Sequence, residues 1–186
     1  RQAAMFALIV DDHPLLRQAI RQVIEDQFSS SVVREASTGE EAVRIVRTEP
    51  VELAVLDVML PDYSGLTVLK RIKSLRPQIK CLMLTIHDEP HYLHLALRYG
   101  ASGYLTKESA PEELRDALRT VLAGGRYVTE RLAGELMPRS RDDATGLERE
   151  LLSARELEVL SLLAKGRTVS QAAARLKLSV KTVSTY

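Results

Sequence analysis

Asp57 lies in an apolar run, residues 53–61, which is too short for a typical globular helix and is closed by Pro61. Such a run is typical of a strand that is buried on both faces, as in the middle of a parallel sheet. Open α/β sheets bind ligands in the crevice beyond the carboxyl ends of their strands. The carboxylate of Asp57 is therefore a candidate functional group, although a single aspartate at a strand end is more often a turn or cap residue.

Other side chains that could do chemistry lie at the ends of three more apolar runs. Asp11 and Asp12 follow residues 5–10, Thr85 ends residues 81–85, and Lys107 follows residues 103–106. Because the carboxyl ends of parallel strands share one crevice, we expect these side chains to lie near Asp57. Taken alone, Asp11 or Asp12 could instead cap the helix that follows, and Lys107 could be an ordinary surface lysine.

Carboxylates held close together repel one another unless a cation neutralises them. An oxygen-only, partly hydrated cluster suits Mg²⁺ (or Mn²⁺), which takes few protein ligands and keeps several waters. With the hydroxyl of Thr85 and the ammonium of Lys107, such a cluster is a suitable site for an aspartyl phosphate. Asp57 would be the nucleophile toward an incoming phosphoryl group, and Mg²⁺ and Lys107 would balance the charge that develops.

The elements that position these residues alternate between strands and helices. The apolar patterns predict strands at 5–10, 32–33, within 53–61, 81–85 and 103–106, and helices at 14–27, 39–46, 65–76, 92–99 and 111–123. Five alternations predict an α/β fold, a five-stranded parallel doubly wound (flavodoxin-like) sheet with helices on both faces. We assign residues 1–127 to this domain.

The remaining residues predict a helical segment, a linker and a small all-α domain. Val128, Leu132 and Leu136 keep helical spacing up to Pro138, and residues 139–146 are polar and linker-like. Residues 128–150 are therefore a helical segment with a flexible linker. In residues 151–186, two short amphipathic helices precede a turn and the start of a third, a pattern typical of a helix-turn-helix, although a helical bundle of other purpose has the same pattern.

Charge and composition limit the function classes. The net charge is −1 over residues 1–127, −2 over 128–150 and +4 over 151–186, which suggests a polyanion-binding module at the C-terminal end, although a plain solvated face carries the same surplus. Cys81 is the single cysteine of the 186 residues and lies in an apolar run, so we expect a buried thiol and no cysteine zinc site. No apolar run approaches the ~20 residues of a membrane span and no signal peptide is visible, so we expect a cytoplasmic protein without a membrane partner.

Two sets of residues carry a resemblance to a known family. The first is Asp11-Asp12, Asp57 with Pro61 and Gly65, Thr85, and Tyr104 with Lys107, which resembles the receiver domain of bacterial two-component response regulators. The second, residues 152–156 and 178–183, resembles the LuxR-type helix-turn-helix. Together they are similar to the NarL/FixJ subfamily of transcription factors.

The resemblance implies that a sensor histidine kinase donates phosphate to Asp57. Mg²⁺ would be bound by Asp12, Asp57 and the backbone carbonyl of Met59, with Asp11 acting largely through water. Thr85 and Lys107 would contact the phosphoryl oxygens, Tyr104 would be the switch aromatic, and Met59 and His87 would tune how fast water removes the phosphate. The protein would then be no conventional enzyme, beyond promoting its own Mg²⁺-dependent phosphorylation and dephosphorylation.

The resemblance also implies a homodimer on phosphorylation and binding to promoter DNA. Lys181 and Thr182 would approach phosphates, while Ser184 and Thr185 match positions that face base edges. Ser184 and Tyr186 depart from the family's usual Lys and His, so base preference does not carry over. Because the sequence stops at Tyr186, early in the recognition helix, we expect this chain to keep its phosphorylation chemistry and to lose most of its DNA affinity.

Of two other function classes, the residues argue against a phosphatase and leave a contact-only regulator open. A haloacid-dehalogenase-like phosphatase would need an Asp two residues after the nucleophile as general acid, and that position is Met59. A regulator acting only through protein contacts, with no direct DNA binding, would use the C-terminal helices as a docking unit.

Overall fold

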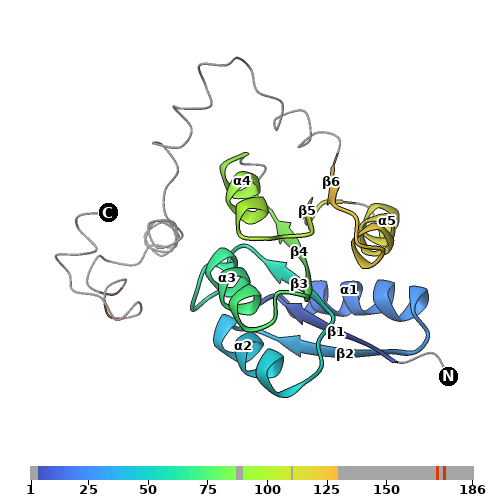
Figure 1. The fold of residues 1–186 in the computed structure, drawn as a ribbon, viewed down its shortest axis with the longest axis horizontal. Coiled ribbons are helices and arrows are strands. Elements are labelled where there is room, and N and C mark those ends of the chain that lie inside the picture. The colour runs from blue at the N-terminus through green and yellow to red at the C-terminus, as the bar shows by residue number, and fades with distance from the viewer. Residues whose placement is uncertain (1–3, 87–89, 110, 130–170, 172–173, 175–186) are drawn as a thin grey trace, which may run out of the picture.

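The computed structural model describes residues 4–86, 90–109 and 111–129, together with Gln171 and Ala174. Within these residues, six parallel strands form one sheet in the order β2-β1-β3-β4-β5-β6 (Figure 1). The strands are β1 (Met5–Val10), β2 (Ser31–Ala36), β3 (Leu53–Asp57), β4 (Lys80–Thr85), β5 (Gly103–Thr106) and β6 (Tyr127–Val128). The helices are α1 (Pro14–Gln27), α2 (Gly39–Thr48), α3 (Gly65–Leu75), α4 (Pro90–Arg98) and α5 (Pro111–Leu122).

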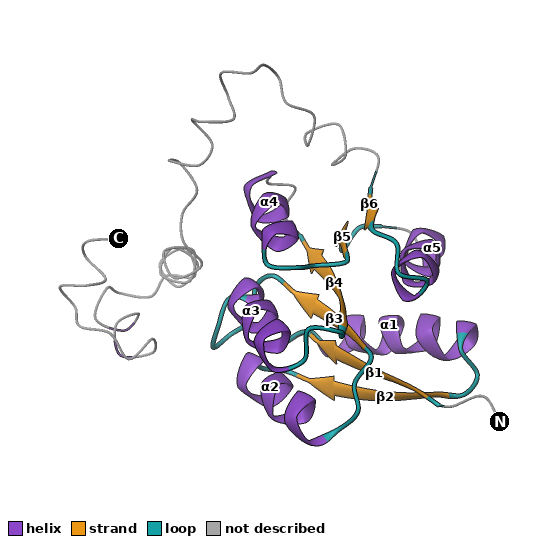
Figure 2. Cartoon of the chain, viewed as in Figure 1, coloured by secondary structure: helices purple, strands orange, loops and turns teal. Residues whose placement is uncertain are grey.

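The helices cover both faces of the sheet. Helices α1 and α5 lie on one face, and α2, α3 and α4 lie on the other (Figure 2). Strand β3 shows the alternation that this arrangement requires, since Ala54 and Leu56 pack in the core under α2–α4 while Leu53 and Val55 pack under α1 and α5. The predicted doubly wound α/β fold is confirmed, and β3 is buried on both faces as its apolar run predicted.

The sheet extends one short strand further than the five predicted. We expected Val128 to begin a helical segment, but it lies in β6 and pairs with Tyr104 of β5. The reason is that β5 would otherwise leave its backbone groups unpaired at the sheet edge, and the Tyr127 N–H donates to the Ser102 carbonyl over 3.1 Å. The rest of the predicted helical segment, the linker and the helix-turn-helix lie outside the described residues, apart from Gln171 and Ala174, which are helical.

Cys81 meets a smaller expectation. The Cys81 thiol is free and buried, and burial raises its pKa to about 12, as expected of a structural residue. Among the described helices, none combines the length and the apolar character that a membrane span requires.

Gly65 begins α3 directly beneath the end of β3. Its N–H donates to the Val58 carbonyl over 2.8 Å. A Cβ at this position would overlap the carbonyl oxygen of Asp57 and would lie 2.8 Å from the carbonyl carbon. Only a glycine therefore lets the backbone of α3 approach the strand end that carries Asp57.

Candidate functional site

The carboxyl ends of β1 and β3 bring Asp11, Asp12 and Asp57 together, as predicted. Asp11 and Asp57 are 1% and 2% exposed, whereas the Asp12 side chain is 35% exposed. One side-chain ligand atom from each of these residues and from His13 lies within 4.8 Å of the others. This end of the sheet therefore holds two buried carboxylates and one that reaches solvent.

Lys107 reaches into the same site from the loop after β5. Its Nζ lies 2.7 Å from Asp11 Oδ2 and 2.7 Å from Asp57 Oδ2, and its side chain is 9% exposed. Its backbone N–H donates to the Thr85 carbonyl over 2.7 Å, which ties the start of the loop to the end of β4. The surface role that Lys107 could have had in isolation is therefore excluded.

Burial and charge act against each other at these groups. Burial raises the pKa of Asp57 and the charge of Asp11 adds to the rise, while hydrogen bonds from Lys107 and from the Met59 backbone oppose it without cancelling it. Burial would lower the pKa of Lys107, but its contacts with Asp11 and Asp57 outweigh burial, so that pKa is raised. Lys107 stays charged, and one ammonium is shared by two buried carboxylates.

The Asp57→Asn substitution is expected to raise the free energy of unfolding at neutral pH without divalent cations, because it removes a carboxylate whose charged form burial disfavours. Because the folded-state pKa of Asp57 is raised, folding takes up protons, and the free energy of unfolding falls as pH rises from the unfolded pKa through the folded one. The gain should therefore be smaller at about pH 4, near the ordinary pKa of an aspartate, because the carboxyl takes up protons as pH falls. Urea unfolding in EDTA at both pH values measures it, and a variant less stable than wild type at neutral pH would contradict it.

The remaining predicted residues lie around this centre. The Met59 N–H donates to Asp57 Oδ1 over 3.0 Å, so Met59 follows the acceptor carboxylate closely. Thr85 is wholly buried at the end of β4, and Tyr104 is wholly buried in the neighbouring β5, in the core under α2–α4. His87 and the predicted DNA contacts lie outside the described residues; these contacts are Lys181, Thr182, Ser184 and Thr185.

His13 is a member of the cluster that the sequence did not single out. Its Nδ1 lies 2.9 Å from Asp11 Oδ1 and 2.8 Å from Asp12 Oδ1, and its backbone N–H donates to Asp11 Oδ1 over 2.7 Å. His13, and neither aspartate, is the N-cap residue of α1, and its own side chain makes no capping hydrogen bond. Only its position directly after the acidic pair could have indicated this contact.

The donor set fits a hard divalent cation. Three carboxylates and one ammonium leave an excess of negative charge, and all of that charge lies on oxygen atoms. Two of the three carboxylates, those of Asp11 and Asp57, are buried away from water. Mg²⁺ and Mn²⁺ accept such oxygen ligands, and Asp12 reaches solvent that could supply the waters Mg²⁺ keeps. The site could therefore hold Mg²⁺ beside a nucleophilic carboxylate.

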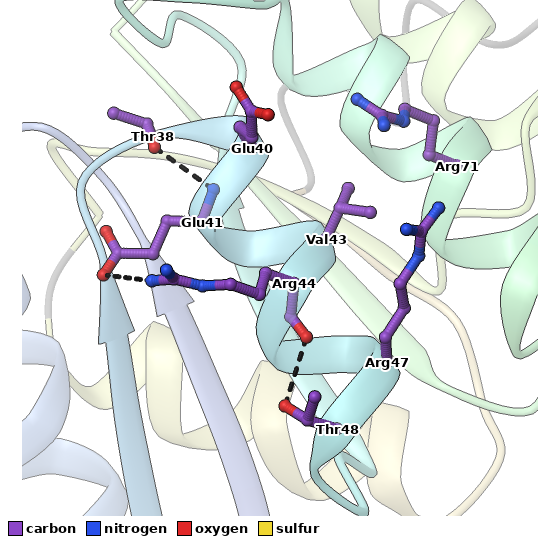
Figure 3. Close-up of a pocket in the computed structure, with 8 residues that line it drawn as sticks. All are labelled: Thr38, Glu40, Glu41, Val43, Arg44, Arg47, Thr48 and Arg71. Atoms are coloured by element: carbon purple, nitrogen blue, oxygen red, sulfur yellow. Dashed lines mark hydrogen bonds and ion pairs between the residues drawn. The ribbon is translucent and has the colours of Figure 1, made fainter.

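A second depression lies between α2 and α3, with a volume of about 570 Å³. Arg47 of α2 and Arg71 of α3 project from its walls, and Arg44 pairs with Glu41 over 3.7 Å (Figure 3). None of the residues that line it belongs to the carboxylate cluster. It is a charged surface hollow separate from the site at the strand ends.

Two family matches cover most of the chain. Residues 7–119 match the family described as "Response regulator receiver domain", and residues 150–186 match "Bacterial regulatory proteins, luxR family". The chain is 37% identical over 180 residues to the response regulator UvrY of Escherichia coli (strain K12), a match that covers 96% of this chain and 83% of UvrY. It is 32% identical over 184 residues to the response regulator GacA of Pseudomonas aeruginosa, covering 96% of this chain and 84% of GacA.

Solved structures agree with these matches. RcsB from Salmonella enterica serovar Typhimurium, bound to promoter P1flhDC in the presence of the phosphomimetic BeF3−, superposes with a TM-score of 0.75 at 27% identity, over 98% of this chain and 88% of that one. A LuxR-family two-component response regulator from Aurantimonas sp. SI85-9A1 gives a TM-score of 0.67 at 32% identity, over 72% of this chain and 96% of that one. The chain therefore belongs to the two-component response regulators of the NarL/FixJ subfamily, transcription regulators that join a phosphorylatable receiver domain to a LuxR-type DNA-binding domain.

Proposed function

We propose that Asp57 is the phosphoacceptor of this regulator and that a sensor histidine kinase is the donor. The observation that carries the proposal is the contact of Lys107 Nζ with both Asp57 and Asp11, beside the solvent-reaching carboxylate of Asp12. A nucleophile, a fixed positive charge and a set of cation ligands are then within reach of one incoming phosphoryl group.

In the transfer, a carboxylate oxygen of Asp57 forms a bond to phosphorus while the bond from phosphorus to the imidazole nitrogen of the kinase histidine breaks. The electron pair of that bond returns to the imidazole. Lys107, already beside Asp57, balances the charge on the phosphoryl oxygens together with the hydroxyl of Thr85. Asp12, Asp57 and the Met59 carbonyl would hold Mg²⁺, with Asp11 acting largely through water, and the ion would supply further stabilisation of charge.

The same site would also couple phosphorylation to a conformational switch and would hydrolyse the aspartyl phosphate. Tyr104 is the proposed switch aromatic, and its complete burial beside the end of β4 suits a side chain whose position depends on Thr85. The protein would promote its own Mg²⁺-dependent phosphorylation and dephosphorylation, with Met59 and His87 setting the rate of hydrolysis. Met59 in place of a second aspartate argues against a phosphatase that turns over small substrates.

The output would be phosphorylation-dependent homodimerisation and promoter binding in the cytoplasm. Because Val128 belongs to β6, we divide the chain into a receiver (1–128), a connecting segment (129–150) and a DNA-binding module (151–186), whose net charge of +4 suits a polyanion. RcsB has been solved as two dimers bound to two parallel DNAs, which supports the same partner here. Lys181 and Thr182 would contact phosphates, and Ser184 and Thr185 base edges. The luxR-family match at 150–186 favours DNA over protein contacts alone.

The test is Mg²⁺-dependent labelling with acetyl phosphate, followed by intact-protein mass. Wild type should gain one phosphoryl group and Asp57→Asn none. Asp62→Asn is the matched control, because Asp62 is a nearby carboxylate that accepts hydrogen bonds from the Gly39 and Glu40 N–H groups over 2.8 and 2.9 Å and lies outside the cluster. The control should be labelled like wild type. Labelling of Asp57→Asn, or no labelling of wild type with Mg²⁺ bound, would overturn the proposal.

A further inference from the structure

Arg17 joins the loop that carries the two aspartates to the edge of the sheet. It lies in α1 with its side chain 15% exposed. Its Nη1 donates to the backbone carbonyl of Asp11 over 2.7 Å, and its Nε donates to Glu35 Oε2 over 2.9 Å. One guanidinium therefore holds the main chain of the acidic loop and a side chain of β2 at the same time.

Glu35 is itself held in place. It lies in β2 opposite Ile9 of β1, and its second oxygen accepts a hydrogen bond from Arg21 Nε over 2.7 Å. Burial would raise the pKa of Glu35, but the hydrogen bonds from Arg21 and Arg17 outweigh it, so the pKa is lowered and the carboxylate stays charged. Arg17 is thus anchored to a fixed partner rather than to solvent.

The hydrogen bond from Arg17 to the Asp11 carbonyl fixes the main chain of both Asp11 and Asp12. The peptide unit between Asp11 and Asp12 is planar, so holding the Asp11 oxygen also sets the direction of the Asp12 N–H and Cα. The Asp11 N–H donates to the Ala36 carbonyl over 3.1 Å, which fixes the preceding peptide unit to β2 as well. Lys107 and His13, by contrast, contact the carboxylate of Asp11 and not its main-chain oxygen.

We infer that Arg17, braced by Glu35, is a positioning residue that fixes the acidic loop in the geometry that binds a divalent cation. This inference rests on the proposed function, because it assigns a supporting residue to the same cation site. Arg17 does not contact the carboxylates that would bind the ion; it acts through the Asp11–Asp12 main chain. Residues that orient metal ligands in this way typically account for 10- to 100-fold in metal affinity.

The probe is Mn²⁺ alone, with free ion counted by electron paramagnetic resonance on the full chain and folding checked by circular dichroism. Arg17→Met keeps the length of the side chain and is expected to raise the Mn²⁺ dissociation constant about tenfold. Arg17→Lys should recover little of the loss, because a single ammonium cannot bridge the Asp11 carbonyl and Glu35 as the guanidinium fork does. Glu35→Gln should weaken Mn²⁺ binding less than Arg17→Met does. It weakens the hydrogen bond between Arg17 and residue 35 but keeps the one between Arg17 and the Asp11 carbonyl.

Arg21→Met is the matched control. Arg21 lies on the same helix, one turn later, and contacts the same carboxylate, but its hydrogen bonds go to Glu35, Glu25 and the Val33 carbonyl and not to Asp11. It should lose stability, and its Mn²⁺ affinity should fall by no more than that of Glu35→Gln, because Arg17 and its contact with the Asp11 carbonyl remain. Labelling by acetyl phosphate should separate the variants in the same way: Arg17→Met should be deficient at low Mg²⁺ and recover at saturating Mg²⁺.

Wild-type affinity in folded Arg17→Met, or an equal loss in Arg21→Met, would overturn the inference. If Arg17→Met does not fold, Arg17→Lys and Glu35→Gln decide it, because wild-type affinity in both would leave Arg17 no positioning role. A wild type that binds no Mn²⁺ would instead overturn the proposed cation site itself. The two failures are therefore distinguishable.

Discussion

Gly65→Ala is expected to destabilise the receiver by about 3 kcal/mol or more. The added Cβ would overlap the carbonyl oxygen of Asp57 and would lie 2.9 Å from the Val58 Cα, and all of these atoms are backbone. Neither β3, buried on both faces, nor the start of α3 can move away without disturbing the core. The change should also displace the Asp57 carboxylate and so reduce labelling by acetyl phosphate.

Gly39→Ala is the matched control for this prediction. Gly39 also begins a helix, and a Cβ there would lie 2.5 Å from Val68 Cγ2, a buried side-chain atom rather than backbone. We expect a cost of about 1–2 kcal/mol, smaller than that of Gly65→Ala, because a side chain can shift by a few tenths of an ångström more easily than two backbone segments. Urea unfolding of the two variants measures the difference, and equal stabilities would show that the approach of α3 to Asp57 is not rigid.

The sequence was informative wherever a periodic pattern decided the outcome. Apolar runs predicted the strands because a parallel sheet buries both faces of its inner strands, and the rule on strand ends then placed Asp11, Asp57 and Lys107 in one crevice. It was less informative for β2, whose pattern suggested only residues 32–33 although the strand spans Ser31–Ala36. An outer strand alternates with polar side chains, and its apolar signal is weaker for that reason.

What the sequence did not predict depends on contacts between distant residues. Lys107 is shared by two carboxylates, Asp62 accepts hydrogen bonds from the first N–H groups of α2, and Arg17 bridges Asp11 and Glu35. Each contact joins elements that only the tertiary fold brings together, so no local spacing encodes it. The short strand β6 is of the same kind, because its pairing with β5 depends on an open sheet edge rather than on its own two residues.

Lys107→Met is expected to cost about 3 kcal/mol of unfolding free energy at neutral pH in EDTA, in the range found when one partner of a buried ion pair is removed. The ammonium lies 2.7 Å from both Asp11 and Asp57, and these carboxylates are almost wholly buried. Without it, two negative charges share a site that water barely reaches. Lys70→Met is the control, since Lys70 is exposed and its Nζ lies over the Tyr99 ring at 4.6 Å; it should cost less than about 1 kcal/mol.

Three further measurements on Lys107→Met separate lost charge from lost packing. Its deficit should shrink as pH falls toward about 4, because the pKa of Asp57, already raised in wild type, rises further and protonation removes the repulsion. The double variant Lys107→Met/Asp57→Asn should recover more than about 1 kcal/mol of the lost unfolding free energy, as expected for residues in direct contact. Saturating Mg²⁺ should stabilise Lys107→Met more than wild type, since the ion would then supply the charge that the ammonium no longer does.

A loss of unfolding free energy that is unchanged by pH, by Asp57→Asn and by Mg²⁺ would mean that Lys107 matters for its packing alone. The proposed role of its charge in phosphoryl transfer would then lose its support.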